Sequence, residues 1–566
     1  MFLILLSWIY ILFTAINLGY LMQRIVLIKN NNFVITSFLG LFLTTILGSI
    51  FAIFYRINIE FQLILFSINL IILIKFKNEI KQIYTLLYAE TKSLIFPLKI
   101  TFITLTTLIV AQCATKPYII DNESYYIQTI KWINEYGFVK GLANLHFFFG
   151  QTSGWHISQS IFSYSFLYKN FNDLSGFCLL LGILFSLQKL NNYFQTQSKI
   201  DLIFGLFPLA NVFFFQFISA PSPDIAMYVL TFIVFYLFVE NYKECSISNF
   251  NTIALLILYI LFIKTISVVL IIIPIVLLSI NFKILKSNLI PITLFSLIVL
   301  ILFLVKNIIL TGYPLFPSIL FGNNSLNYEV PKKLMDFYFT KSMLYEFFLT
   351  TEELNSLTNF QIFLKWITMS RIDGIINLIS ILILFISPLF IYKFLNKKSI
   401  WILYFTVIFQ MIILFLSSPQ FRFFIHLILF LSFIILASLF YKKNIILLFN
   451  YLSILLLIII LFFPISYKSL TQNNLISKNS NFSINNLVFP HDNSKVKNTY
   501  KKIVKGNLHY NSPINNDFFW GNGNGDLPCV NQQQLDYFEK YFNVIPQMRT
   551  TNLKDGFYAK KLSPNE

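Results

Sequence analysis

Long apolar runs separated by short polar segments recur along the chain from residue 1 to about residue 464. Most of these runs are long enough to cross the roughly 30 Å of hydrocarbon in a bilayer as a helix. They predict membrane spans over 1–22, 33–54, 60–75, 94–112, 172–189, 201–219, 224–240, 288–309, 374–392, 400–416, 424–441 and 445–464. With a further, interrupted stretch at 251–280, the pattern predicts an all-α polytopic membrane protein of about 12–14 transmembrane helices.

The composition agrees with a membrane location and argues against a nucleic-acid partner. The chain is 57% hydrophobic and 12% charged, whereas a soluble chain carries about twice that charged fraction. The formal charge of +18 would favour nucleic acid if the basic residues shared one soluble face. They lie instead in short clusters between apolar runs, which is the pattern of cytoplasmic loops.

These basic clusters also predict the orientation of the chain. They occupy 24–29, 75–92, 189–199, 243, 393–398 and 442–443, and we expect all of them on the cytoplasmic side. Alternation then places the N-terminus and the loops 113–171 and 220–223 outside. If 251–280 crossed once, the cluster at 393–398 would move outside as well, so we predict a broken hairpin with its break near Lys264. The alternative is one long tilted helix with a snorkelling lysine.

Three polar regions are therefore expected on the outer face, namely loop 113–171, loop 310–373 and the tail 465–566. The tail is rich in Asn, Ser and Gly, and it predicts a small mixed soluble domain of short strands and loops. No phosphate-binding loop with the spacing GxxxxGK[ST] occurs in the chain, which argues against an ATP-driven pump.

Loop 113–171 carries the most informative acidic residues. From Glu123 to Tyr136 the apolar positions follow helical spacing, which predicts an amphipathic helix at the membrane interface. Asp121 and Glu123 stand where this helix would begin, so one interpretation is helix capping. The other is that one of these carboxylates is a general base, which deprotonates an acceptor hydroxyl as it attacks a sugar anomeric carbon.

A second acid and several cations lie near other predicted helix mouths. Asp224 follows two prolines in SAPSPDIAMY, where it either caps a helix or provides a second carboxylate that holds a divalent metal or shapes an acceptor site. Lys264, Arg371 and Arg422 are candidates for binding a donor phosphate, with anchoring at the headgroup level as the alternative.

Aromatic and imidazole side chains of loop 113–171 are candidates for contact with a sugar or an acceptor. They are Tyr125, Tyr126, His146, Trp155 and His156. The two histidines make a weak metal pair, because no third ligand lies nearby in the sequence. The sequence assigns no cofactor; a divalent cation remains an open alternative, and its ligands are unknown.

The motifs DNESYY, IKWINEYG, GLANLH, TGYPLFPS and DLPCV resemble those of a group of uncharacterised bacterial multi-pass membrane proteins. More distantly, the chain resembles the GT-C class of membrane glycosyltransferases, which includes protein mannosyltransferases and lipid A aminoarabinose transferases. The resemblance implies a GT-C-like core over 94–464, with 1–93 as added helices. It also implies that Asp121 is the catalytic aspartate, Asp224 the second acid and Arg422 a donor-phosphate contact.

Two departures from the GT-C pattern leave open which carboxylate acts. Asn122 separates Asp121 from Glu123 where many GT-C enzymes have adjacent acids, and Tyr125-Tyr126 stands where some relatives have Tyr-His.

The leading hypothesis is an inverting hexosyl or pentosyl transferase in the bacterial inner membrane. It would move a sugar from a polyprenyl-phosphate carrier to a glycan or lipid acceptor at the outer face. The alternatives are a transporter or flippase of a lipid-linked saccharide, and a non-catalytic membrane protein of envelope assembly.

Overall fold

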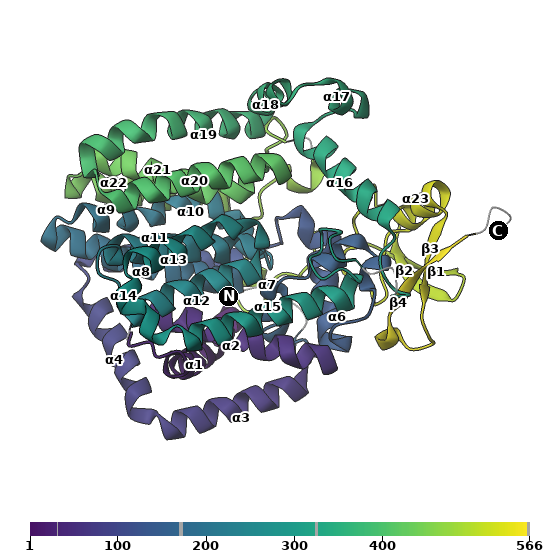
Figure 1. Cartoon of the computed structure of the whole chain (residues 1–566), viewed down its shortest axis with the longest axis horizontal. Helices are drawn as coiled ribbons and strands as arrows, with labels where there is room; N and C mark the ends of the chain where they lie inside the picture. The colour runs from purple at the N-terminus through teal and green to yellow at the C-terminus, as the bar shows by residue number, and fades with distance from the viewer. Residues whose placement is uncertain (31, 169–173, 323–325, 472, 515, 563–566) are drawn as a thin grey trace.

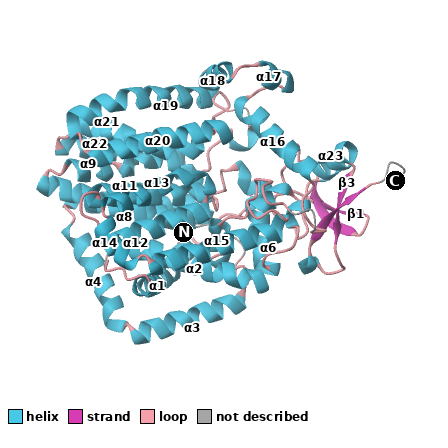
Figure 2. Cartoon of the chain, in the orientation of Figure 1, coloured by secondary structure: helices cyan, strands magenta, loops and turns pink. Residues whose placement is uncertain are grey.

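The computed structural model describes residues 1–30, 32–168, 174–322, 326–471, 473–514 and 516–562. Long helices lie side by side along the long axis of the molecule, and a small part with strands extends from one end (Figures 1 and 2). Among the described residues, 11 helices are long and apolar enough to cross a membrane. They correspond to eleven of the twelve uninterrupted spans that the apolar runs predict, and the twelfth, 60–75, belongs to a bent pair of helices.

The candidate spans follow the predicted ranges closely. They are α1 (Phe2–Ile25), α2 (Phe33–Phe54), α5 (Phe96–Cys113), α8 (Leu174–Thr196), the broken span Lys199–Ser219, α11 (Pro223–Asn241), α15 (Ile290–Thr311), α19 (Arg371–Phe390), α20 (Lys398–Ser417), α21 (Phe421–Leu439) and α22 (Lys443–Phe462). The predicted start of span 172–189 lies outside the described residues.

Two spans are less regular than the pattern predicts. The span Lys199–Ser219 is built from α9 (Lys199–Gly205), α10 (Asn211–Phe214) and short 3-10 turns, one of which contains Pro208. Proline at this position cannot donate a backbone hydrogen bond, so the regular helix is interrupted. The predicted span 60–75 corresponds to α3 (Ile59–Lys75), which meets the amphipathic α4 (Lys77–Ser93) at an angle of 91°.

The stretch 251–280 forms the predicted hairpin. The helix α12 (Ile247–Ile263) ends at Lys264, whose backbone is extended, and the chain continues as a 3-10 segment and α13 (Ile272–Ile280), followed by the single turn α14 (Phe282–Leu285). Asn281 accepts a hydrogen bond from the backbone of Cys245 at 3.1 Å and donates to the carbonyl of Tyr242 at 3.4 Å. The chain thus returns to the end of the bundle from which it set out, so the alternative of one long helix is wrong.

The connecting segments gather at two opposite ends of the bundle (Figure 1). We call one the basic end, because its loops carry the basic clusters predicted to be cytoplasmic. Hydrogen bonds join these loops to one another: Lys29 to Ser248, Tyr193 to the carbonyl of Tyr441, and Lys199 to the carbonyl of Phe394.

The other end, which we call the loop end, carries loops 113–171 and 310–373 and the tail. Loop 113–171 contains η1 (Asn122–Tyr126), a π-helical turn, followed by α6 (Ile127–Tyr136) and α7 (Gly154–Ile161). Loop 310–373 contains α16 (Lys332–Phe347), α17 (Thr351–Ser356) and α18 (Asn359–Ile367). The three regions expected on the outer face therefore lie at the same end of the bundle, and the side of the membrane that this end faces stays a prediction.

The tail forms a small mixed fold on loop 113–171. Its elements are the antiparallel pair β1 (Tyr500–Lys505) and β2 (Leu508–Pro513), the helix α23 (Gln532–Phe542), and the antiparallel pair β3 (Val544–Met548) and β4 (Phe557–Lys561). Gln128 donates to the carbonyls of Gly523 and Gly525, and Phe557 donates to the carbonyl of Lys140. The tail is thus docked along the loop.

This docking corrects one prediction about loop 113–171. The helix expected to lie at the membrane interface has its apolar face inside the protein, where Trp132 is fully buried and packs against Phe557. Lys131, on the polar face, donates to carbonyls of Asn524 and Gly525. The helix is amphipathic because it packs between the bundle and the tail. The spacing of apolar residues does not distinguish a helix face buried in protein from one in contact with lipid.

Candidate functional site

Two ion pairs form at the loop end of the bundle. The guanidinium of Arg422, in the first turn of α21, contacts the carboxylate of Asp121 at 2.5 Å. The ammonium of Lys264, at the break of the hairpin, pairs with the carboxylate of Asp224 in the first turn of α11. The structure therefore pairs Asp121 and Asp224, two of the three predicted acids, each with one of the predicted phosphate-binding cations.

The ring of Phe423 holds the two ion pairs next to each other. The Nζ atom of Lys264 lies 4.1 Å from the centre of this ring, and the guanidinium carbon of Arg422 lies 4.9 Å from it. Cations over an aromatic face are attracted by about 0.5–2 kcal/mol each. The Phe423 side chain thus connects the hairpin, through Lys264, to α21.

Neither carboxylate caps its helix. Asp121 makes no side-chain capping bond to η1, and Ser222, not Asp224, accepts the bond from the first turn of α11. The capping interpretation is therefore not what the structure shows at either position. Both carboxylates face cations instead, and the N-terminus of α11 adds a favourable potential at Asp224.

Glu123 takes a different position from Asp121. Its carboxylate is buried and accepts hydrogen bonds from the Ser494 hydroxyl at 2.6 Å, the Lys495 backbone at 2.7 Å and the Asn122 amide at 3.0 Å. Burial raises the pKa of Glu123, and these donors oppose the shift. The two acids of the DNESYY motif thus point to different partners: Asp121 to the ion pair and Glu123 to the tail.

The two tyrosines of the same motif lie beside the Asp121 pair. The hydroxyl of Tyr126 donates to the carboxylate of Asp121 at 3.4 Å. The ring of Tyr125 contacts those of Tyr126 and Phe148. Both tyrosines are buried, which raises the pKa of each phenol well above its ordinary value. They are therefore neutral hydrogen-bonding groups around Asp121.

The two histidines are neutral and have local partners. Nδ1 of His156 accepts the backbone N–H of Ser153, and burial together with Lys306 and Lys264 lowers the pKa of His156 to about 3. Nδ1 of His146 accepts the backbone N–H of Phe148, while burial lowers its pKa to about 3. Among the described residues no group of three or more His, Cys, Asp or Glu could hold a metal ion.

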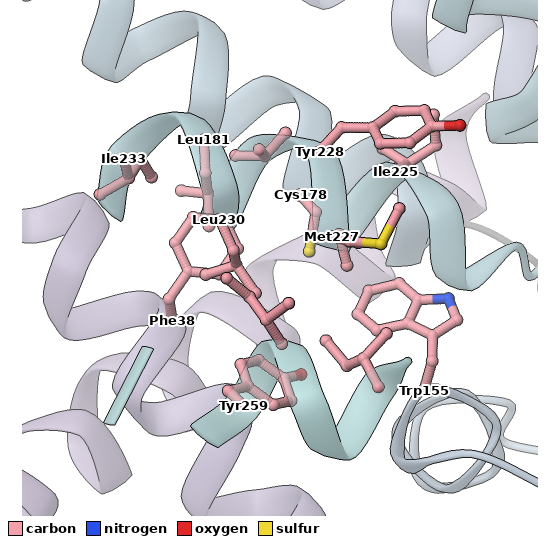
Figure 3. Packing of buried hydrophobic residues seen from close by; sticks show 14 of the residues in the cluster. Phe38, Trp155, Cys178, Leu181, Ile225, Met227, Tyr228, Leu230, Ile233 and Tyr259 are labelled. Carbon is pink, nitrogen blue, oxygen red and sulfur yellow. The ribbon is translucent and has the colours of Figure 1, made fainter. Parts of the chain in front are cut away.

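Two predicted contacts take no part in the ion pairs. Trp155 is fully buried and belongs to the same apolar cluster as Met227 and Tyr259 (Figure 3). In this conformation it offers no free ring face to a sugar. Arg371, the first residue of α19, is exposed and has no ion-pair partner among the described residues.

Three further polar residues near the site were not predicted. Gln420 accepts a hydrogen bond from Nε of Arg422 at 2.7 Å, and its amide donates to Glu346 at 2.9 Å. Lys306 is buried within α15 and donates to the carbonyl of Thr152. A lysine inside the predicted span 288–309 was a signal that could have identified it. Glu346 gave no such signal, since it stands in a polar helix of loop 310–373.

An aromatic surface borders the site on the side of the tail. Phe148 packs against Tyr125, Tyr338 of α16 and Trp520 of the tail, with ring centres 4.8–5.6 Å apart. Gln151 donates to the hydroxyl of Tyr338 at 2.6 Å. The three outer regions therefore meet beside Asp121.

The fold and the charged residues at its loop end define a polytopic helical membrane protein with paired acids and cations at one end of the bundle. The chain belongs to the family described as "Domain of unknown function (DUF8201)", whose model matches residues 1–429. The matched region contains both ion pairs and the first 93 residues, and it ends before the tail. No curated protein and no solved structure matches the chain.

Proposed function

We propose that this protein is a membrane glycosyltransferase, which moves a sugar from a polyprenyl-phosphate carrier to a glycan or lipid acceptor. The observation that carries the proposal is the convergence of Asp121, Asp224, Arg422 and Lys264 at the loop end of the bundle. A transferase of this type needs a carboxylate base and cations for the departing phosphate within one site. The resemblance to GT-C enzymes supports the same assignment.

The chemistry that these groups would perform is an inverting displacement. An acceptor hydroxyl attacks the anomeric carbon of the sugar, and its oxygen forms the new glycosidic bond. The bond from that carbon to the phosphate oxygen breaks, and the polyprenyl phosphate leaves with the electron pair. The carboxylate of Asp121 takes the acceptor's proton, while Arg422 and Lys264 stabilise the charge on the phosphate.

The observed ion pairs then represent the resting state of the site. A phosphate that enters competes with the carboxylates for Arg422 and Lys264, and a phosphate monoester or diester is a strong partner for a guanidinium. Arg422 leaves Asp121 as it turns to the phosphate, so the base becomes free only when the donor is bound. Asp121 is 22% exposed, which leaves its carboxylate open to an acceptor.

The charge distribution supports an outward orientation of the site. The basic loops lie at the end opposite to Asp121 and Asp224, and loops rich in lysine and arginine are retained in the cytoplasm. The site would then face the outer side of a bacterial inner membrane, where a lipid carrier and a water-borne acceptor meet.

The test measures release of the carrier by the full-length protein in lipid nanodiscs. The protein is incubated with a panel of undecaprenyl-phosphate-linked hexoses and pentoses, with cell-envelope extract as acceptor, and undecaprenyl phosphate is quantified by mass spectrometry. Parallel samples with Mg²⁺ and with EDTA decide whether a divalent cation is required. Asp121→Asn should lower the rate by at least about a hundredfold.

Asp336→Asn, which changes an exposed acid of α16, is the matched control. Equal release by wild type, Asp121→Asn and Asp224→Asn would refute the proposal. Movement of the intact lipid-linked saccharide across the bilayer would instead support a transporter or flippase, and absence of both reactions in wild type would support an assembly role.

A further inference from the structure

A chain of hydrogen bonds leads from Arg422 to an acid in loop 310–373. Nε of Arg422 donates to the Oε1 atom of Gln420 at 2.7 Å. Nε2 of Gln420 donates in turn to the Oε1 atom of Glu346, near the end of α16, at 2.9 Å. The guanidinium is thus held on one edge by Asp121 and on the other by Gln420.

Glu346 is itself firmly placed. Its Oε1 atom also accepts from the hydroxyls of Ser342 at 2.9 Å and Ser418 at 2.7 Å. Its Oε2 atom is buried and has no hydrogen-bond partner among the described residues. A buried carboxylate oxygen without a donor is costly, so the position of this acid requires a reason beyond the stability of α16.

The remainder of α16 explains how the acid keeps its position. The hydroxyl of Tyr338 accepts from Gln151, and its ring stacks on Phe147 with centres 4.1 Å apart. One residue earlier, Phe337 packs against Tyr537 of the tail helix α23. The helix is therefore fixed on loop 113–171 and on the tail, and it carries Glu346 to the first turn of α21.

The polarity of a carboxylate determines which way the Gln420 amide faces. An ionised carboxylate only accepts hydrogen bonds, whereas an amide has one accepting and one donating end. Facing Glu346, Gln420 must direct its NH₂ group to the carboxylate, and its carbonyl oxygen then faces Arg422. If the amide were reversed, its NH₂ group would oppose the N–H of Arg422, and the guanidinium would lose this contact.

We propose that Glu346 is a positioning residue, which orients the Gln420 amide so that Arg422 is aimed at the place of the donor phosphate. The consequence for the donor rests on the proposed function, while the control of Arg422 by Glu346 does not. Glu346 touches neither the reacting atoms nor the phosphate, and it acts through Gln420.

The test exchanges the two side chains. In Glu346→Gln the new amide can face Gln420 with either end, so the orientation of Gln420 is lost. In Gln420→Glu two carboxylates face each other. The double variant E346Q/Q420E restores one donor facing one acceptor: the amide at 346 donates to the carboxylate at 420, which accepts from Arg422.

The first readout is the Nε–H signal of Arg422 in ¹⁵N-arginine-labelled, full-length protein, assigned with Arg422→Lys. We expect both single variants to shift or broaden this signal and the double variant to restore it. Glu353→Gln, which changes a partly exposed acid of α17 that pairs with Lys365, should leave it unchanged. A wild-type signal in Glu346→Gln would overturn the proposal, as would a double variant no better than Gln420→Glu.

The second readout is the affinity for undecaprenyl phosphate in nanodiscs. We expect Glu346→Gln to weaken binding by about tenfold, since a charge-assisted hydrogen bond is lost, and the double variant to recover most of it. If wild-type protein does not bind this lipid, the proposed function fails while the signal of Arg422 still decides the role of Glu346. If Glu346→Gln shifts the Arg422 signal but leaves the lipid affinity unchanged, only the second part of the proposal, that Glu346 affects donor binding, is overturned.

Discussion

The guanidinium of Arg422 contacts the carboxylate of Asp121 at 2.5 Å, although 301 positions separate the two residues in the chain. This contact closes the outer loop onto the first turn of α21. The two side chains are 26% and 22% exposed, so water screens the pair and ligands can reach it. The pair of Asp224 with Lys264 is less accessible, because the Asp224 side chain is only 4% exposed. The two ion pairs should therefore respond differently to substitution.

Substitutions in the Asp121 pair should change function more than stability. A partly exposed ion pair contributes about 0–1 kcal/mol to folding. We expect Arg422→Gln to leave thermal unfolding in detergent nearly unchanged while it weakens binding of undecaprenyl phosphate by about tenfold to a hundredfold. A variant that unfolds at much lower temperature and binds the lipid normally would contradict this division.

Substitutions in the Asp224 pair should cost stability. Removing one partner of a buried pair leaves an uncompensated charge, which costs about 3–5 kcal/mol. Asp224→Asn should lower the unfolding temperature clearly, and so should Lys264→Met. The double variant should be more stable than either single variant, because no charge is left unpaired. Additive losses in the double variant would show that the two side chains do not act as a pair.

Acidification should destabilise the protein through His146 and His156. Burial lowers the pKa of each to about 3, whereas an unfolded chain has a value near 6.5. The unfolded state therefore binds more protons between these values, and stability falls as pH decreases from about 6.5 toward 3. The loss is at most about 1.4 kcal/mol per pH unit for each histidine.

Thermal unfolding at pH 7 and pH 5 measures this effect. His146→Gln should be less stable than wild type at pH 7 and show a smaller further loss at pH 5. His509→Gln, at an exposed position of β2, should keep the full wild-type loss. If His146→Gln lost as much between the two pH values as wild type, buried His146 would not be a source of the acid sensitivity.

Docking of the tail should depend on Gly556, just before β4. Its φ angle is +93°, and an added Cβ atom would lie 1.9 Å from the carbonyl oxygen of Lys140. Gly556→Ala should therefore separate β4 from loop 113–171 and make the tail sensitive to limited proteolysis. Thr551→Ala, at an exposed position nearby, is the control. Equal resistance of both variants would show that the tail does not need this close contact.

The orientation of the bundle can be tested by cysteine labelling. All four native cysteines are buried, so their background should be low. In intact bacterial cells, a membrane-impermeant maleimide should label Lys497→Cys, in the tail. It should label Lys393→Cys, in a basic loop, only after the membrane is opened. The reverse pattern would place Asp121 and Asp224 on the cytoplasmic side and would end the case for transfer to an external acceptor.

Much of the fold could be predicted from the sequence, because each apolar span and each basic cluster is a local signal. The hairpin break is one example, since only a double crossing keeps the cluster 393–398 on the same side as the other basic clusters. The burial of α6 could not be predicted, because the sequence pattern of an apolar helix face is the same whether that face contacts lipid, the bundle or the tail.

The charged residues of the site could be named from the sequence, but their partners could not. Asp121, Asp224, Lys264 and Arg422 all stand near helix ends, where charges in a membrane protein are informative. Which cation meets which acid depends on the packing of helices that are far apart in the chain. Glu123 shows the limit most clearly, since Asp121, two positions away, faces Arg422, while two of the three donors to Glu123 come from residues 494 and 495.

The buried carboxylate of Glu123 makes the residue type at position 123 depend on the C-terminal tail. The family match ends at residue 429, and two of the three donors to this acid, from Ser494 and Lys495, come from beyond it. A relative with an unrelated C-terminal region would inherit a buried acid that lacks these two donors, at a cost of about 1–3 kcal/mol. Such relatives should carry an uncharged residue at that position, or supply replacement donors from another segment. The side chain at position 123 should therefore indicate which type of tail a family member has.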